Sequence, residues 1–263
     1  MESKPPEYKA ASLEEIKDTI KNPPSRDETV HRFICDEVGF WRLQALLEQH
    51  RVAGLYFDAS LKHLRFVTMP TWIHNNAASW FTIWAQSLTQ YPQYPQLSNA
   101  DPSVAQIDGL DGRNKEPDAG FCPDDNTGLP TIAVEVGYSE TLDDLHFDAR
   151  VLLEGSQGQI QLVILIHIQP LQRGDTSIQK AVIQLWEYDS MQNKAIYKTR
   201  YNVIPPPKSH SKQQINIPWT TILRNGPFPT SPPPPLNLDF LRSKLASGVK
   251  NHLLMKERVN KAS

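Results

Sequence analysis

Two apolar segments joined by an amphipathic one constrain the fold of this chain more than any other feature of the sequence. Residues 160–168 form a nearly continuous apolar run, which is typical of a strand that is covered on both faces. Residues 131–137 form a second apolar strand, and residues 140–154 carry leucine and alanine at helical spacing. Two strands joined by a helix are expected to lie parallel, with a right-handed connection. The sequence therefore predicts an α/β protein with a mixed sheet.

The rest of the chain adds helices at both ends and further strands. Apolar spacing, capping residues and alternation predict these elements. In chain order, they are a helix after the N-cap Ser12, helices within residues 28–51, a hairpin over residues 53–69, a helix over residues 75–90 capped by Asn75 or Asn76, strands over residues 180–188 and 195–201, and an amphipathic helix over residues 236–259. Residues 91–114 are polar and irregular, and their pattern predicts no regular element.

Proline content and these elements divide the chain into three parts. Residues 1–50 are expected to form an N-terminal tail and helices, residues 51–204 the core, and residues 205–263 a proline-rich segment followed by the C-terminal helix. The 22 prolines cluster into runs, which form stiff and extended spacers. Recognition of these runs by small proline-binding domains is the alternative to a spacer role.

The composition indicates a globular protein of a reducing compartment. The chain is 39% hydrophobic and 21% charged, and its net charge of -2 excludes a basic nucleic-acid-binding surface over the whole molecule, although it leaves a local basic groove open. Two cysteines, Cys35 and Cys122, and no evident signal peptide favour free thiols and an intracellular location, in the nucleus or the cytoplasm. No apolar run is long enough to span a bilayer, so no membrane association is expected.

Two acids, Asp118 and Glu135, are the main candidates for chemistry. Side chains alternate along a strand, so residues 132, 134 and 136 share an apolar face, whereas Glu135 shares its face with small residues only. This leaves room above Glu135 for a metal ion and a substrate. Asp118 follows a proline and is expected to approach the same point from the preceding strand. Two carboxylates at one site repel each other unless a cation lies between them, and Mg²⁺ (or Mn²⁺) suits such ligands and can activate a water molecule.

The order of these motifs resembles that of a known superfamily. Pro117-Asp118, then Glu135-Val136-Gly137 on an apolar strand, then a helix and a second apolar strand resemble the PD-(D/E)XK nuclease superfamily, which has the restriction-endonuclease-like fold. Within it, the chain is most similar to the Uma-type restriction endonucleases and their eukaryotic relatives, on residues 66–70, on His74 before a helix and on residues 135–140. The resemblance covers residues 55–188. It implies an αβββαβ core, Mg²⁺-dependent hydrolysis of phosphodiester bonds in DNA, and metal ligation by Asp118, Glu135 and the carbonyl group of Val136.

One position departs from this pattern. The superfamily has a lysine two residues after the strand acid, where it helps to hold and activate the attacking water, and this chain has Gly137. Some members carry the cation on the following helix, where Arg150 is the candidate, one turn after His146. Arg150 could orient water or phosphate but could not act as a base at neutral pH. Lys115 is a second candidate, although strand alternation points it away from the face of Asp118.

Each of these residues also has a structural interpretation. Asp118 can begin a turn, Glu135 can pair with a buried basic residue, and Arg150 can form a surface ion pair. His74 can hydrogen-bond to nearby backbone, and His167 can be a core histidine. The aromatic residues of the helix over residues 75–90 are expected to pack in the core, with base stacking as the alternative: Trp80, Phe81 and Trp84.

Three hypotheses on function follow. The first is a metal-dependent nuclease that acts on DNA, in which Asp118 and Glu135 hold Mg²⁺ and Arg150 contacts phosphate or water. The second is a catalytically inactive nuclease-fold protein that binds nucleic acid or protein, which the missing lysine favours; its proline-rich tail and C-terminal helix would contact a partner or form a homodimer. The third is a structural domain in which Arg150 neutralises Glu135.

Overall fold

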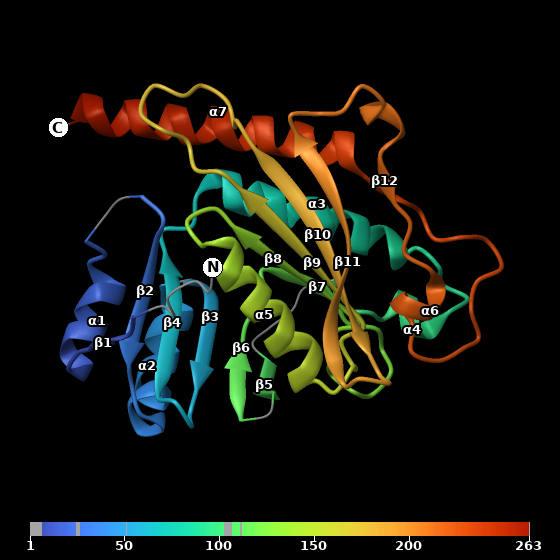
Figure 1. The fold of residues 1–263 in the computed structure, drawn as a ribbon, viewed down its shortest axis with the longest axis horizontal. Coiled ribbons are helices and arrows are strands. Elements are labelled where there is room, and N and C mark those ends of the chain that lie inside the picture. Colours follow the sequence, from blue (N-terminus) through green and yellow to red (C-terminus); the bar gives the residue numbers. More distant parts are fainter. Residues whose placement is uncertain (1–6, 25–26, 51, 103–106, 111, 263) are drawn as a thin grey trace. The chain divides into compact units, whose positions relative to one another are not determined.

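The computed structural model describes residues 7–24, 27–50, 52–102, 107–110 and 112–262 of an α/β protein with helices near both ends. The chain forms two compact units, one made of residues 1–70 and 106–116 and the other of residues 71–105 and 117–263 (Figure 1). This division differs from the expected boundaries after residues 50 and 204. The N-terminal strands pair with the hairpin, and the C-terminal helix packs against the helix that begins at residue 72.

The first unit contains one sheet of six strands in the order β1-β2-β4-β3-β6-β5. Its elements are β1 (Lys9–Ala10), α1 (Leu13–Lys21), β2 (Thr29–Ile34), α2 (Glu37–Gln49), β3 (Ala53–Asp58), β4 (His63–Thr68), β5 (Ile107–Leu110) and β6 (Arg113–Lys115). A hydrophobic core forms where apolar residues of α1 and α2, such as Ile16 and Phe40, meet one face of the sheet, which carries Phe57 and Phe66. Alternation along β3 and β4 places these two phenylalanines on the same face.

Two predictions in this unit are confirmed, and the helices predicted within residues 28–51 are confirmed for α2 only. Helix α1 begins after Ser12, whose side chain and that of Glu15 form a capping box, and residues 53–69 contain the predicted hairpin β3–β4. Residues 29–34, by contrast, form the strand β2 and no helix. Their β-branched and aromatic side chains suit a strand, and pairing with β4 outweighs the helical spacing that the apolar residues suggest.

The second unit is built around a five-stranded mixed sheet in the order β11-β10-β9-β8-β7. Its elements are α3 (Trp72–Leu88), α4 (Pro95–Ser98), β7 (Ala119–Phe121), β8 (Ile132–Gly137), α5 (Leu142–Gly155), β9 (Leu162–Ile168), β10 (Ala181–Asp189), β11 (Lys194–Ile204), the short 3-10 helix η1 (His210–Lys212), β12 (Gln214–Ile215), α6 (Trp219–Ile222), β13 (Leu236–Asn237) and α7 (Leu238–Ala262). Strands β8 and β9 are parallel and joined by α5, as predicted, whereas β7–β8, β9–β10 and β10–β11 are antiparallel.

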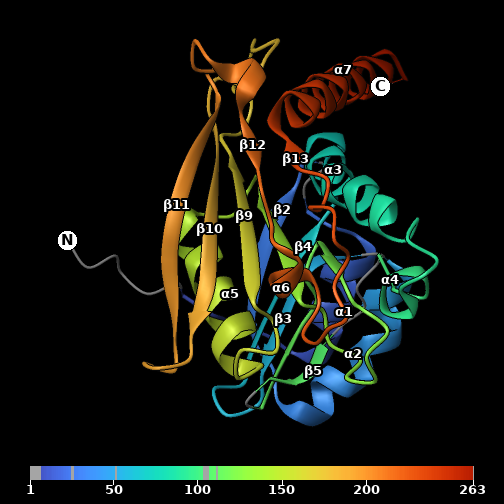
Figure 2. The same ribbon diagram turned by 90° about the vertical axis from the view of Figure 1, so that its right-hand side faces the viewer.

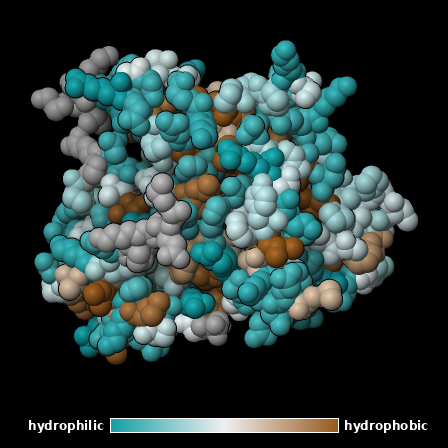
Figure 3. Space-filling model, in the orientation of Figure 1, coloured by the Kyte–Doolittle hydropathy of each residue, from teal (hydrophilic) through white to brown (hydrophobic). Residues whose placement is uncertain are grey.

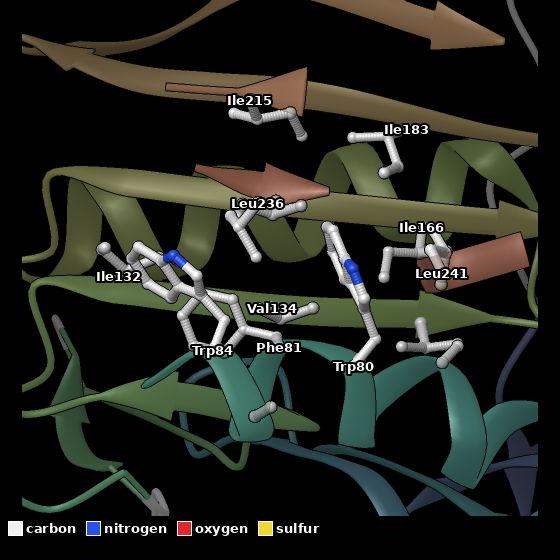
Figure 4. Close-up of a cluster of buried hydrophobic side chains, with 14 of the residues drawn as sticks. Trp80, Phe81, Trp84, Ile132, Val134, Ile166, Ile183, Ile215, Leu236 and Leu241 are labelled. Carbon is white, nitrogen blue, oxygen red and sulfur yellow. The ribbon is translucent and has the colours of Figure 1, made fainter. Parts of the chain in front are cut away.

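Helices cover both faces of this sheet. Figure 2 shows the sheet between α5 on one side and α3 with α7 on the other. The face toward α3 carries the main core, in which Trp80, Phe81 and Trp84 of α3 pack against Val134 and apolar residues of the neighbouring strands (Figure 4). The core role predicted for these aromatic residues is therefore confirmed. At 1%, 0% and 7% exposed, they are not available for base stacking.

The proline-rich segment before α7 is held to the second unit by indole hydrogen bonds. Trp219 Nε1 donates to Ser231 O at 2.6 Å, Trp84 Nε1 to Pro234 O at 2.7 Å, and Trp80 Nε1 to Asn237 O at 2.9 Å. Because proline runs expose carbonyl groups that have no partner within the run, these donors fix the segment along the core. Residues 231–237 are thus part of the packed body and do not act as a loose spacer.

Helix α7 packs along α3, which explains its apolar stripe (Figure 1). Leu241, Leu245 and Val249 of this stripe are buried. The two helices approach closely at Gly248, where an added Cβ atom would come within 2.9 Å of the Cα atom of Ile73. A side chain at position 248 would therefore force the two backbones apart.

Other differences from prediction concern residues 71–115. Helix α3 begins at Trp72, because the Thr71 side chain accepts a hydrogen bond from the backbone N–H of His74. The cap expected at Asn75 or Asn76 is therefore wrong. The irregular stretch 91–114 contains α4, β5 and most of β6, while its residues 103–106 and 111 lie outside the described parts of the chain. Within the described ranges, no helix has the length and apolar character that crossing a membrane requires.

The turn of the β3–β4 hairpin is held by Asp58, whose side chain is only 2% exposed. Its oxygens accept hydrogen bonds from Ser60 Oγ at 2.6 Å, Leu61 N at 2.9 Å, Arg113 Nε at 3.0 Å and Tyr56 Oη at 3.1 Å. Burial alone would raise the pKa of Asp58, but these donors outweigh it and lower the pKa to about 2. The ionised carboxylate therefore stabilises the folded state.

We expect acid to weaken the first unit through Asp58. A pKa depressed to about 2 in the folded state contributes stability above the unfolded pKa of about 3.9, and this contribution is lost as the pH falls from about 5 toward 2. The loss should be on the order of 2 kcal/mol, and urea unfolding across this pH range measures it. Asp58→Asn should flatten the profile, whereas the same change at exposed Asp124 should not. Parallel profiles for wild type and Asp58→Asn would contradict this assignment.

Candidate functional site

Asp118 lies at the point where β7 joins the edge of β8. Its backbone N–H donates to the carbonyl oxygen of Val134 at 3.0 Å, and its Oδ2 accepts a hydrogen bond from the backbone N–H of Val136 at 2.7 Å. Asp118 precedes Ala119, the first residue of β7, and continues the pairing with β8. Its main chain bonds to Val134 and its side chain bonds to Val136. A carboxylate that accepts from a backbone N–H forms one of the stronger hydrogen bonds in proteins.

The other oxygen of Asp118 contacts a helix. Oδ1 lies 3.0 Å from Nε2 of His74 in the first turn of α3, and the two side chains are only 4% and 3% exposed. An ionised carboxylate can only accept, so Nε2 is the protonated nitrogen of His74. The sequence contained a signal for this pair. His74 lies on the same helical stripe as Ala77 and Phe81, so a polar side chain on the buried face required a partner.

Glu135 and Val136 occupy successive positions of β8 and point to different faces. Val136 belongs to the main core beneath α3, and Glu135 is fully buried on the face that α5 covers. The alternation predicted for this strand is confirmed. The N–H and C=O groups of one residue point to the same edge of a strand, so the carbonyl group of Val136 lies on the β7 side, where its N–H meets Asp118.

Helix α5 packs closely on the strand face that carries Glu135. A Cβ atom added to Gly137 would lie 2.8 Å from Cδ1 and 3.1 Å from Cγ of Leu145. Leu145 and Ala149 of α5 are both fully buried, so the helix rests directly on the small residues of this strand face. The absence of large side chains lets the helix approach at Gly137, while the space predicted above Glu135 for metal and substrate stays a prediction.

The two basic candidates lie elsewhere. Arg150 is exposed on α5 and forms no ion pair with any residue in the described part of the chain, so it does not neutralise Glu135. Lys115 is fully buried in β6 of the first unit, opposite Tyr56, and its Nζ donates to Glu116 O at 3.2 Å. His146, one turn before Arg150, turns toward β10, where its Nε2 lies 2.7 Å from Gln184 Oε1. The second unit thus brings Asp118, Val136 and His74 together, without Arg150.

The hydrogen-bond donors around Asp118 would compete with a metal ion for its carboxylate oxygens. Both of its carboxylate oxygens already have hydrogen-bonding partners, and Mg²⁺ would compete with His74 and with the Val136 N–H for them. In the residues that the structure describes, no group of three or more histidine, cysteine, aspartate or glutamate side chains is arranged to hold a metal ion. These contacts fit a structural carboxylate better than a magnesium ligand, which prefers octahedral oxygen ligation with several waters.

A pocket of about 440 Å³ lies in the first unit, and none of the motif residues Asp118, Glu135 and Val136 lines it. Its walls include Ile34, Cys35, Val38 and the cations Arg42 and Lys62. Burial raises the pKa of the Cys35 thiol to about 11, and the Asp36 carboxylate adds to this shift. A thiol with so high a pKa is protonated at neutral pH and is not a nucleophile. Both cysteines are free, as predicted.

Comparison with known proteins does not assign this chain to a family. The sequence matches no protein-family model, and no curated protein is similar to it.

The contact between β8 and α5 predicts the effect of side chains at position 137. Gly137→Ala should lower the free energy of unfolding by about 1–2 kcal/mol, because the new methyl group presses on Leu145 in a packed core. Urea unfolding measures the loss. In the double variant Gly137→Ala/Leu145→Ala the cost should be smaller than the sum of the single costs, because truncating the leucine removes the overlap. Additive costs would show that the two positions do not press on each other.

Removing the Asp118 carboxylate should destabilise the protein strongly. Asp118→Ala leaves the Val136 N–H and His74 Nε2 without this acceptor inside the protein, which should cost about 2–4 kcal/mol. Thermal and urea unfolding test this value. The control is Asp124→Ala, because Asp124 is exposed and accepts only from Asn99 Nδ2 at 3.2 Å; its cost should stay below about 0.5 kcal/mol. Equal costs at the two positions would contradict the structural role of Asp118.

Proposed function

We propose that this protein is a catalytically inactive relative of the PD-(D/E)XK nucleases that acts by binding nucleic acid. The support begins with the order of elements in the second unit. A helix, α3, precedes the antiparallel pair β7–β8, which carries Pro117-Asp118 and Glu135-Val136-Gly137, and α5 then leads to the parallel strand β9. This order agrees with the later part of the αβββαβ core. Only two strands precede α5 in this sheet, because β7 is its edge strand.

The contact of Gly137 with Leu145 carries the proposal. In the nuclease pattern this position holds the lysine that activates water. Here a lysine would place its first side-chain carbon within 2.8 Å of Leu145 Cδ1, and the remaining carbons would have to pass a fully buried helix. The packing of α5 therefore excludes the usual catalytic cation from this strand.

Arg150, the candidate cation on helix α5, does not replace the missing lysine at the position where the structure places it. The guanidinium group is exposed, whereas Glu135 is fully buried on the opposite side of the helix layer. The acid at the other motif position, Asp118, is engaged with His74 and with the backbone of β8. The contacts of Asp118 thus support a structural role for this acid, and the architecture supports descent from a nucleic-acid enzyme.

A metal-dependent nuclease is the competing proposal, and one observation favours it. The main-chain and side-chain hydrogen bonds of Asp118 to Val134 and Val136 place this acid beside the strand segment that contains Glu135. Two acids on neighbouring strands are what a shared Mg²⁺ or Mn²⁺ ion requires. In that case the ion would supply an activated water molecule, and Asp118, Glu135 and the carbonyl group of Val136 would hold it.

Incubation of the purified full chain with plasmid and with single-stranded DNA in Mn²⁺ separates the two proposals. We expect no nicking above background, and no difference between wild type and Glu135→Gln, whose similar shape keeps the strand intact. Circular dichroism and the melting temperature confirm that the variant is folded. Cleavage by wild type that Glu135→Gln abolishes would overturn the inactive assignment in favour of the nuclease.

The binding part of the proposal has its own readout. Fluorescence anisotropy with labelled single-stranded DNA, RNA and duplex DNA at about 50 mM salt should show saturable binding of at least one of them, because low salt strengthens phosphate contacts. Absence of binding to all three would refute the proposed function, whatever the cleavage assay gives.

A further inference from the structure

Strands β10 and β11 form a part of the second unit's sheet that α5 covers only in part. Alternation places Gln184 and Trp186 of β10 on the face of the sheet that carries α5, while Ala181, Ile183 and Leu185 belong to the core on the other face. In β11, Arg200 pairs with Gln184 and Tyr197 with Trp186, so their side chains lie on this same face. Figure 3 shows this side of the molecule, where hydrophilic residues predominate.

Aromatic rings on this surface are fixed in orientation. Oε1 of Gln184 accepts from Trp186 Nε1 at 3.1 Å and lies 2.7 Å from His146 Nε2, so one amide holds both rings. The ring centroids of His146 and Trp186 are 4.9 Å apart. The rings of Trp186 and Tyr197 meet edge to face, with their centroids 6.0 Å apart. Tyr197 is the outermost ring and is 50% exposed. Tyr197 is half-exposed and already packs on one side against Trp186. Such a ring can accept a planar ligand on its free side at little entropic cost.

Cations lie along the same strands. Arg200 is exposed on β11, and exposed Lys180 directly precedes β10, on the same side as Gln184 by alternation. Neither forms an ion pair with the part of the chain that the structure describes. Burial lowers the pKa of His167 on β9, and the positive charges of Lys180, Arg200 and His146 lower it further. The neighbouring groups therefore create a positive potential around His167.

Two acids of this region, Glu187 and Glu154, are engaged with other groups. Glu187 of β10 lies on the opposite face by alternation and pairs with Lys198 at 3.1 Å. Glu154 of α5 directs its Oε1 to the backbone N–H of Ala195, near the start of β11. The strand positions from Lys180 to Trp186 span about 20 Å, so two cations and a ring are spread over the length of a few nucleotides.

We propose that the surface formed by His146, His167, Lys180, Trp186, Tyr197 and Arg200 binds single-stranded DNA, with a base stacked on Tyr197 and phosphates contacted by Lys180 and Arg200. This inference rests on the proposed nucleic-acid-binding function and names its partner and its surface. A ring on a sheet can stack only on a base that is free of a duplex, which selects single strands. RNA of the same length shares this chemistry and is the alternative outcome of the test.

Anisotropy titration of the full chain with a labelled 20-nucleotide single-stranded DNA tests this surface. Tyr197→Ala should weaken binding about tenfold, whereas Tyr197→Phe, which keeps the ring, should stay within about twofold of wild type. The double variant Lys180→Glu/Arg200→Glu should weaken binding by more than about tenfold and reduce the slope of log affinity against log salt by about 1.4. The control is Lys198→Ala, on the same strand but paired with Glu187, which should bind as wild type does.

The outcomes separate this inference from the function on which it rests. If wild type binds single-stranded DNA and the Tyr197 and charge-reversal variants bind equally well, the surface is wrong but the nucleic-acid-binding function stands. Tighter binding of duplex DNA or of RNA of the same length overturns the single-stranded DNA assignment. Failure of wild type to bind any of the three nucleic acids overturns both. Unchanged melting temperatures, expected for these exposed positions, exclude unfolding as the cause of lost binding.

Discussion

The carboxylate of Asp118 connects three elements of the second unit, the paired strands β7 and β8 and the helix α3. Strand β7 begins at Ala119, so the backbone N–H of Val136 lies beyond the last main-chain partner that β7 provides, and the Asp118 side chain takes that place. The same group receives His74 from α3. Leaving one buried donor without an acceptor costs about 1–3 kcal/mol, so this acid fixes both the edge of the sheet and the first turn of the helix that covers it.

This arrangement changes the meaning of the nuclease-like motif. An acid that holds a metal needs oxygens turned toward an open site, but those of Asp118 are turned toward a helix and a strand in a nearly dry environment, at 4% exposure. The neighbouring position Gly137 permits close packing with Leu145 instead of presenting a cation. The same residues that mark a catalytic centre by their order in the sequence here provide hydrogen bonds and close contact between strand and helix.

Local pattern was sufficient to predict the elements whose partners follow directly in the chain. The β8-α5-β9 unit, the β3–β4 hairpin, α1 and the apolar stripe of α7 all carry their periodicity within one segment. The pattern failed for β2, because its strand conformation depends on pairing with β4. It also failed to place residues 107–115 in the sheet that contains β1 to β4. A short polar segment carries no periodicity that indicates the distant strand with which it pairs.

The candidate site illustrates the same limit. The two acids and the alternation of β8 were readable from the sequence, but the occupant of the space above Glu135 was not. A strand face of small residues is compatible with a cavity and equally with a closely packed helix, and only the approach of α5 decides between them. His74 was recognisable as a buried polar residue on a helical stripe, although its partner, Asp118, lies 44 positions away in the chain.

The position of α5 determines which side chains of the sheet remain accessible to a ligand. The helix lies over the small residues of β8, and this close contact closes the face on which the motif acid Glu135 lies. Strands β10 and β11 are covered by α5 only in part, and their exposed positions keep a tyrosine and cations without ion pairs in the described chain. We propose that such a fold, with this face closed, would contact DNA through the partly covered strands β10 and β11. Binding without hydrolysis is the proposal that this packing supports.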